Sequence, residues 1–83
     1  MKKFANGIYN VKITDITTGE SSRKGTPYLE LTYSNGIRYI NDRIHTSNNG
    51  YKYLSLIFWK AGLDFARNSI DELLGRRIGI EVI

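Results

Sequence analysis

Apolar and polar residues alternate near the start of the chain. Between residues 7 and 17, the side chains of Tyr9, Val11 and Ile13 alternate with polar ones, a period of two that is typical of a strand with one buried face. Residues 18–27 are polar, contain two glycines and the only proline, and show no periodicity. They predict a long connecting loop after this strand.

Two more alternating segments flank an Asn-Gly dipeptide at 35–36 and predict a β-hairpin. The segments cover 28–33 and 37–44, and Asn-Gly between such segments is the strongest short signal for a two-residue type I′ turn. This turn places Ser34 opposite Ile37, and the pairing of the other hairpin residues follows by counting outward from it.

The predicted register gives the hairpin two different faces, because neighbouring residues of a strand point to opposite sides. The first face is apolar and is expected to lie in the core; it carries Leu29, Leu31, Tyr33, Ile40 and Ile44. The second face is expected to be open to solvent or to a ligand; it carries Tyr28, Glu30, Thr32, Ile37, Tyr39, Asn41 and Arg43.

The second half of the chain has helical spacing. Apolar residues at i, i+3, i+4 and i+7 predict a helix over 51–61 that ends at Gly62 in the left-handed conformation. A capping box at 69–72 predicts a short helical turn, and 78–83 predicts a final strand. The expected fold is therefore a β-rich α+β domain over residues 1–83, with one main helix and a short second helical turn.

Two aromatic residues, Tyr53 and Trp59, fall off the main apolar stripe of the predicted helix. Either side chain could cover a sheet edge, or bind a partner if it is exposed. For a Trp in so small a domain, packing in the core is the favoured expectation.

Composition narrows the function classes. The chain has 83 residues, 41% of them hydrophobic, which suffices for one compact domain. It has no cysteine and a single histidine, which excludes disulfides, cysteine nucleophiles and thiolate or histidine-rich metal sites. Carboxylates are scattered over different elements, so we expect no enzyme activity, no cofactor and no metal. Without a long apolar run, we expect a soluble chain that is not exported and has no membrane partner.

The net charge of +4 favours an anionic partner. Proteins bind single-stranded nucleic acid with planar side chains that stack on the bases and with cations that follow the phosphates. The candidate binding residues that match this pattern are Lys12, Arg23, Lys24, Tyr28, Arg38, Tyr39 and Arg43. The same residues also fit an ordinary strand surface, because Tyr favours strands and Tyr–Arg pairs are common across them.

The order strand, long basic loop, hairpin, helix, strand is that of an OB-fold, and the sequence resembles a family of bacteriophage single-stranded DNA-binding proteins with that fold. The motifs are short and largely structural, although they cover most of the chain. The matching residues are Gly7-Ile8-Tyr9 with Val11 and Ile13, Gly25-Thr26-Pro27-Tyr28-Leu29 with Leu31, Ala61-Gly62-Leu63, and Leu73-Leu74-Gly75-Arg76.

This resemblance implies a single-stranded DNA or RNA partner, no base-specific readout, and a place in the cytoplasm of a host cell. Such proteins also have a fifth strand that closes the barrel and an acidic tail, whereas this sequence reaches Ile83 at the end of its predicted fourth strand. We therefore expect a partial barrel whose open edge is completed by a second copy, as a homodimer, or by another protein.

An alternative function follows from the same open edge. A phage-encoded inhibitor of a host or defence nuclease, comparable in role to anti-CRISPR proteins, could reuse a truncated OB scaffold to bind a protein. The positive net charge speaks against mimicry of nucleic acid, for which an acidic surface is expected.

Overall fold

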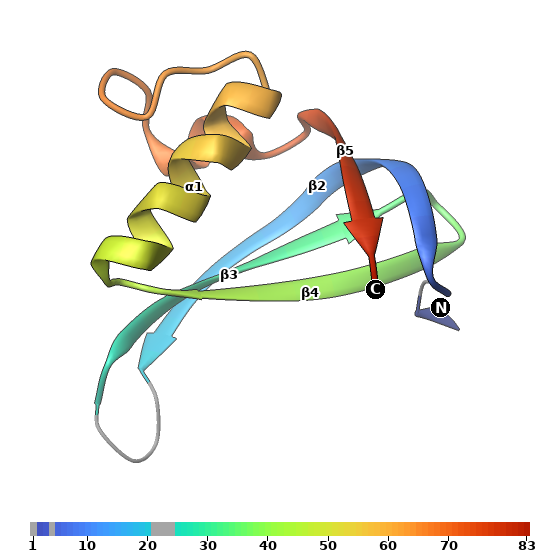
Figure 1. The fold of residues 1–83 in the computed structure, drawn as a ribbon, viewed down its shortest axis with the longest axis horizontal. Helices are drawn as coiled ribbons and strands as arrows, with labels where there is room; N and C mark the ends of the chain where they lie inside the picture. Colours follow the sequence, from blue (N-terminus) through green and yellow to red (C-terminus); the bar gives the residue numbers. More distant parts are fainter. Residues whose placement is uncertain (1, 4, 21–24) are drawn as a thin grey trace.

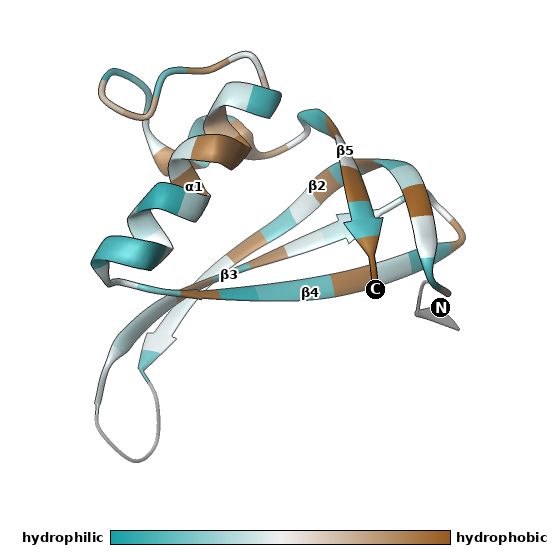
Figure 2. Ribbon diagram, in the orientation of Figure 1, coloured by the Kyte–Doolittle hydropathy of each residue, from teal (hydrophilic) through white to brown (hydrophobic). Residues whose placement is uncertain are grey.

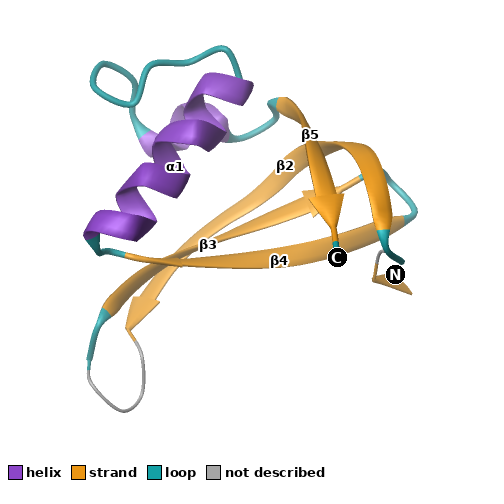
Figure 3. Cartoon of the chain, in the orientation of Figure 1, coloured by secondary structure: helices purple, strands orange, loops and turns teal. Residues whose placement is uncertain are grey.

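The computed structural model describes residues 2–3, 5–20 and 25–83. The described strands form one sheet in the order β1-β4-β3-β2-β5, with a helix and a 3₁₀ turn between β4 and β5 (Figures 1 and 3). The elements are β1 (Lys2–Lys3), β2 (Gly7–Glu20), β3 (Pro27–Ser34), β4 (Arg38–His45), α1 (Asn48–Lys60), η1 (Ile70–Leu73) and β5 (Arg77–Val82).

The main elements follow the predicted order β-β-β-α-β. β2 pairs antiparallel with both β3 and β5, and β3 pairs antiparallel with β4. The fold is thus α+β and β-rich, a partial OB-like arrangement whose sheet is not closed. No helix in the described part of the chain is both long enough and apolar enough to cross a membrane.

β2 is longer than predicted and contains an irregularity. It continues to Glu20 and pairs with β3 along 12–20, so the predicted loop over 18–27 is too long at its start. A β-bulge between Ile13 and Asp15 leaves Thr14 without a partner on β3 and returns Ile16 to the side of Leu31. Apolar and polar positions still alternate along the sheet (Figure 2).

The hairpin register differs by two residues from the prediction. Ser34 pairs with Tyr39 and not with Ile37, so four residues, 35–38, separate this innermost pair, although Arg38 already belongs to β4; the predicted two-residue turn is wrong. The Asn35 side chain explains the longer loop, because its Oδ1 accepts hydrogen bonds from two loop amides at 2.9 and 2.8 Å. A shift of two residues preserves the faces, so the predicted division is confirmed for the residues of β3 and β4. Ile37, predicted on the open face, lies instead in the turn between the strands.

α1 covers one end of the sheet and packs against β4 and β5 (Figure 1). It starts earlier than predicted, where the Ser47 hydroxyl accepts a hydrogen bond from the Gly50 amide at 3.2 Å. It ends as predicted, with Gly62 at φ +77°. The buried core residues are Val11, Ile13, Leu29, Leu31, Tyr33, Ile44, Leu54, Ile57, Phe58, Ala61, Leu73 and Ile78.

The expectation that Trp59 packs in the core is wrong. Its side chain is 73% exposed, whereas its neighbour Phe58 is fully buried. The apolar stripe of α1 is narrow enough to be filled by Leu54, Ile57 and Phe58, and one step along the helix turns Trp59 by about 100° to the outside.

β1 is a short parallel strand that the sequence pattern did not predict. It pairs with β4 only at Arg38 and Tyr39. Among the described residues, no strand pairs with the rest of this edge of β4, nor with the edge of β5 that faces away from β2. The predicted open edge is therefore present, and it lies between β4 and β5.

Candidate nucleic-acid interface

The face of β2, β3 and β4 that points away from the core carries most of the candidate binding residues, and we call it the open face. Its side chains run from the end of β4 near His45, across the middle of the hairpin, to the crossing of β2 with β5. The open face is defined by Lys12, Thr14, Asp15, Tyr28, Glu30, Thr32, Tyr39, Asn41, Arg43 and Arg77.

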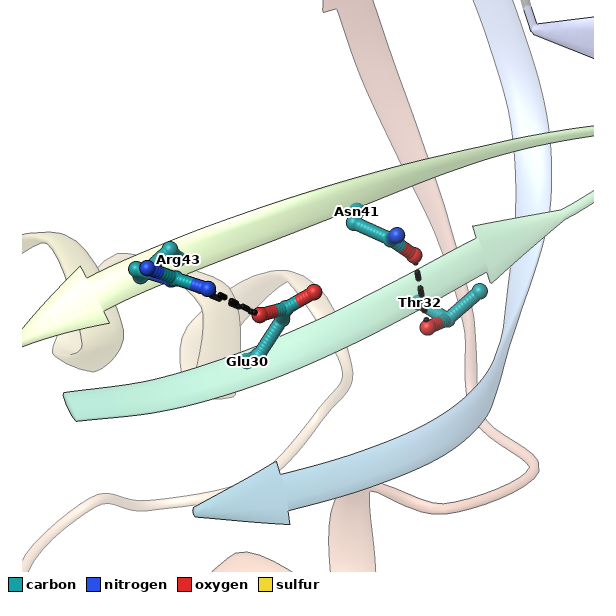
Figure 4. A network of polar contacts seen from close by, with 4 residues as sticks. All are labelled: Glu30, Thr32, Asn41 and Arg43. Atoms are coloured by element: carbon teal, nitrogen blue, oxygen red, sulfur yellow. Dashed lines mark hydrogen bonds and ion pairs between the residues drawn. The ribbon is translucent and has the colours of Figure 1, made fainter. Parts of the chain in front are cut away.

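Tyr28 and Arg43 form a stacked pair at one end of the open face. The guanidinium carbon of Arg43 lies 4.0 Å from the centroid of the Tyr28 ring, and Arg43 also pairs with Glu30 at 3.2 Å (Figure 4). The Tyr28 ring lies across the backbone of Gly19, where a Cβ would come within 2.6 Å of the Tyr28 hydroxyl oxygen. Because both sides of the ring are occupied, the exposed plane at this end is the Arg43 guanidinium.

The middle of the open face is a shallow hollow lined by Thr, Ser, Asp, Asn and Tyr residues. Thr32 donates a hydrogen bond to Asn41 Oδ1 at 2.9 Å, and Figure 4 shows this pair on the same side of the hairpin as Arg43. The hollow has a volume of about 460 Å³ and also includes Tyr39, which is half-buried, and Thr14. Hydroxyl and amide groups there offer both donors and acceptors beside an aromatic ring.

Two cations lie together where β2 crosses β5. Lys12 and Arg77 are register partners, and both line a cavity of about 310 Å³. Arg77 is not among the seven candidates, although the Arg76-Arg77 dipeptide suits either a helix C-cap or a phosphate contact; only the pairing of β2 with β5 brings Arg77 beside Lys12. The neighbouring Arg76 instead donates to the carbonyl of Glu72 at 3.3 Å and closes the 3₁₀ turn.

The remaining candidates are not part of this group. Strand alternation places Arg38 on the same side of β4 as Ile40, away from the open face. Arg23 and Lys24 lie outside the described residues. The structure therefore brings four of the predicted residues onto one face, Lys12, Tyr28, Tyr39 and Arg43.

Comparison with protein-family models, with curated proteins and with solved structures finds no match to this chain. The chemistry of the open face is therefore the basis for its interpretation. Three cationic groups, Lys12, Arg43 and Arg77, flank a polar hollow with an aromatic ring, and two carboxylates, Asp15 and Glu30, lie among them. This arrangement suits a ligand that is both anionic and planar.

Proposed function

We propose that this protein is a small module that binds single-stranded nucleic acid on the open face, without base-specific readout. The observation that carries the proposal is the placement of Tyr39, Asn41 and Arg43 at alternate positions of β4. Two planar groups, the Tyr39 ring and the Arg43 guanidinium, then lie about 13 Å apart along one strand, at about 3.3 Å per residue.

The cations and the planar groups would contact different parts of the ligand. Lys12 and Arg77 suit the phosphates, while the Tyr39 ring and the Arg43 guanidinium offer planes on which unstacked bases can lie. Stacking tolerates any base, and the hydroxyl and amide groups of Thr32 and Asn41 serve equally as donors and acceptors. Binding therefore depends on salt and on single-stranded character more than on sequence.

The sequence resemblance to phage single-stranded DNA-binding proteins and the OB-like strand order support the same function. In OB-folds, the face of the second and third strands is the usual oligonucleotide surface, and β3 and β4 occupy that position in this chain. A module of this kind would act in the cytoplasm of a phage-infected host cell.

The direct test is the fluorescence anisotropy of a labelled oligothymidine titrated with protein at 50 and 200 mM salt. Two phosphate contacts, by Lys12 and Arg77, predict an affinity that falls roughly 7-fold between these salt concentrations. Undetectable binding at both concentrations would contradict the proposed function.

Tyr39→Ala tests the stacking platform. We expect a loss of about 1 to 3 kcal/mol in oligothymidine binding, or roughly 5- to 150-fold in affinity. Tyr39→Phe keeps the ring and should bind nearly as tightly as the parent. Lys52→Ala, on the exposed side of α1, is the control for a general loss of positive charge. If Tyr39→Ala binds oligothymidine as tightly as the parent, Tyr39 is not part of the binding site.

A further inference from the structure

A groove separates β4 from β5 on the side of the sheet opposite the open face. Its volume is about 370 Å³, and α1 contributes Tyr53, Leu56, Ile57 and Lys60 to its lining. Most of its lining is apolar and comes from alternate residues of the two strands and from α1: Ile40, Leu56, Ile57, Ile78, Ile80 and Val82. A hollow of this size and composition is typical of a binding site.

The groove also reaches the backbone edges of both strands. Asn41 belongs to the open face by alternation, yet it lines the groove together with its neighbours Ile40 and Asp42. Glu81 likewise lines it between Ile80 and Val82. Because no described strand pairs with these stretches, their N–H and C=O groups form a template for an added strand.

One acceptor inside the groove is held in a fixed position. The hydroxyls of Tyr33 and Tyr53 both donate to Oδ2 of Asp42, at 2.8 and 2.6 Å. Among the described residues, none donates to Oδ1 of the same carboxylate. A tyrosine phenol is protonated at neutral pH, so both hydroxyls donate and orient the carboxylate; burial and the nearby Asp42 raise the pKa of Tyr33 above its usual range.

One carboxylate and one ammonium group face the groove, those of Asp42 and Lys60, and the ammonium group of Lys60 donates to the Gly79 carbonyl at 3.5 Å. Glu81 lines the groove with its backbone, because strand alternation directs its side chain away from Ile80 and Val82. A phosphate backbone in the groove would have to approach the Asp42 carboxylate. A symmetric contact with a second copy through this stretch of β4 would bring the Asp42 carboxylates toward each other. The lining instead complements an apolar segment that carries a basic side chain.

We infer that this groove binds an extended segment of a partner protein, which adds a strand to β4, buries alternate apolar side chains between β4 and β5, and directs a Lys or Arg to Asp42. Strand addition of this kind derives affinity from main-chain hydrogen bonds and specificity from side-chain pockets. The site is separate from the open face, so the inference does not depend on nucleic-acid binding.

The outer surface of α1 continues the apolar lining of the groove. Leu56 is 46% exposed and lines the groove, and Trp59 follows it by three residues on the helix at 73% exposed. Residues three apart are neighbours on a helix surface, so a segment that leaves the groove over Leu56 meets the indole ring. An exposed Trp beside a pocket is a frequent energetic anchor in protein interfaces.

The test is selection of a displayed library of random nine-residue peptides against the intact protein. We expect enrichment of peptides that alternate apolar residues and contain a Lys or Arg. The best enriched peptide, labelled with a fluorophore, should bind Asp42→Asn at least tenfold more weakly than the parent, because the charge-assisted hydrogen bond is lost. Absence of enrichment, or enrichment of acidic peptides, would overturn the inference.

Matched variants separate this site from the rest of the protein. Asp71→Asn makes the same chemical change at an exposed position of η1 and should leave peptide affinity unchanged. Leu56→Lys, at the rim of the groove, should weaken the peptide at least tenfold and keep parent-like binding of oligothymidine. Equal peptide affinity for Leu56→Lys and the parent would place the peptide elsewhere and overturn the inference.

A second copy is the competing occupant, and its presence is measurable. Sedimentation velocity at about 100 µM should show a monomer, because a symmetric contact through β4 would bring the Asp42 carboxylates of the two copies toward each other. A dimer that Leu56→Lys dissociates and that competes with the selected peptide would overturn the assignment of the groove to a different protein.

Discussion

The two surfaces of β4 differ in charge and polarity although they share one strand. On the open face, Tyr39 and Arg43 lie beside polar side chains and other cations. On the groove side, Ile40 and Asp42 lie beside apolar residues and the ammonium group of Lys60. The open face suits a planar anion, and the groove suits an apolar segment with a basic side chain.

This difference shows how a small domain can hold two unlike sites. Successive side chains of a strand point to opposite sides, so residues 39 to 43 contribute to both surfaces without sharing a side chain. Two sites on one small sheet leave the core incomplete on the groove side, where the sheet is not closed. The buried core residues of β3, in the middle of the sheet, support both surfaces.

The largest effect should come from breaking both surfaces at once. Leu31 is fully buried in β3, between β2 and β4. Leu31→Ala should lower the free energy of unfolding by about 2 to 5 kcal/mol, as measured by urea denaturation, and reduce binding at both sites. Leu74→Ala makes the same change at an exposed position and should have a much smaller effect. A cost under about 1 kcal/mol for Leu31→Ala would contradict the shared core.

Removing two cations should weaken binding on the open face and leave the groove unchanged. In the double variant Lys12→Ala/Arg77→Ala, we expect the slope of log affinity for oligothymidine against log salt to become shallower by about 1.4, because each lost phosphate contact contributes about 0.7. The control, Lys52→Ala/Arg67→Ala, removes equal charge from exposed positions on or after α1. Equal slopes for the two double variants would show that only net charge matters.

Alkaline pH should lower the stability of the protein through the tyrosine hydroxyls on the groove side. Burial and the hydrogen bond to Asp42 raise the pKa of Tyr53 to about 12, whereas an unfolded Tyr ionises near pH 10. The unfolded chain releases this proton first, so the free energy of unfolding should fall as pH rises from about 10 to 12. Tyr53→Phe should make this fall shallower in urea denaturation at stepped pH. An unchanged slope would contradict the hydrogen bond of the Tyr53 phenol to Asp42.

The smallest effect on stability should come from Trp59. Because its side chain is 73% exposed, Trp59→Ala should change the free energy of unfolding by less than about 0.5 kcal/mol. Phe58→Ala, one residue earlier and fully buried, should cost about 3 to 5 kcal/mol. Thermal unfolding of the two variants compares them directly. A similar loss of stability in both would show that Trp59 packs in the core.

Sequence patterns predicted the elements well and some of their details poorly. The faces of the hairpin survived an error of two residues in register, because a slip by an even number keeps each side chain on its side. The error itself came from Asn35, whose side chain closes a four-residue loop that an Asn-Gly signal does not distinguish. The bulge at Thr14 has no local signal, since the pairing with β3 creates it.

Only part of the candidate site was predicted, because sequence patterns reveal neighbours within one hairpin but not pairing between distant strands. Tyr28, Tyr39 and Arg43 lie on one hairpin, so local alternation was enough to group them. Arg77 joined them only through the pairing of β2 with β5, which connects residues far apart in the chain. The groove depends on the same long-range pairing, and only its open edge was foreseeable from the order of elements.

The most direct test of the two-surface account is a ¹H–¹⁵N NMR titration of the protein with unlabelled oligothymidine at low salt. The account predicts amide shifts at Lys12, Thr32 and Arg43 on the open face, with Leu56 and Ile80 in the groove unchanged. Shifts concentrated in the groove, or no shifts at all, would contradict the assignment of nucleic acid to the open face.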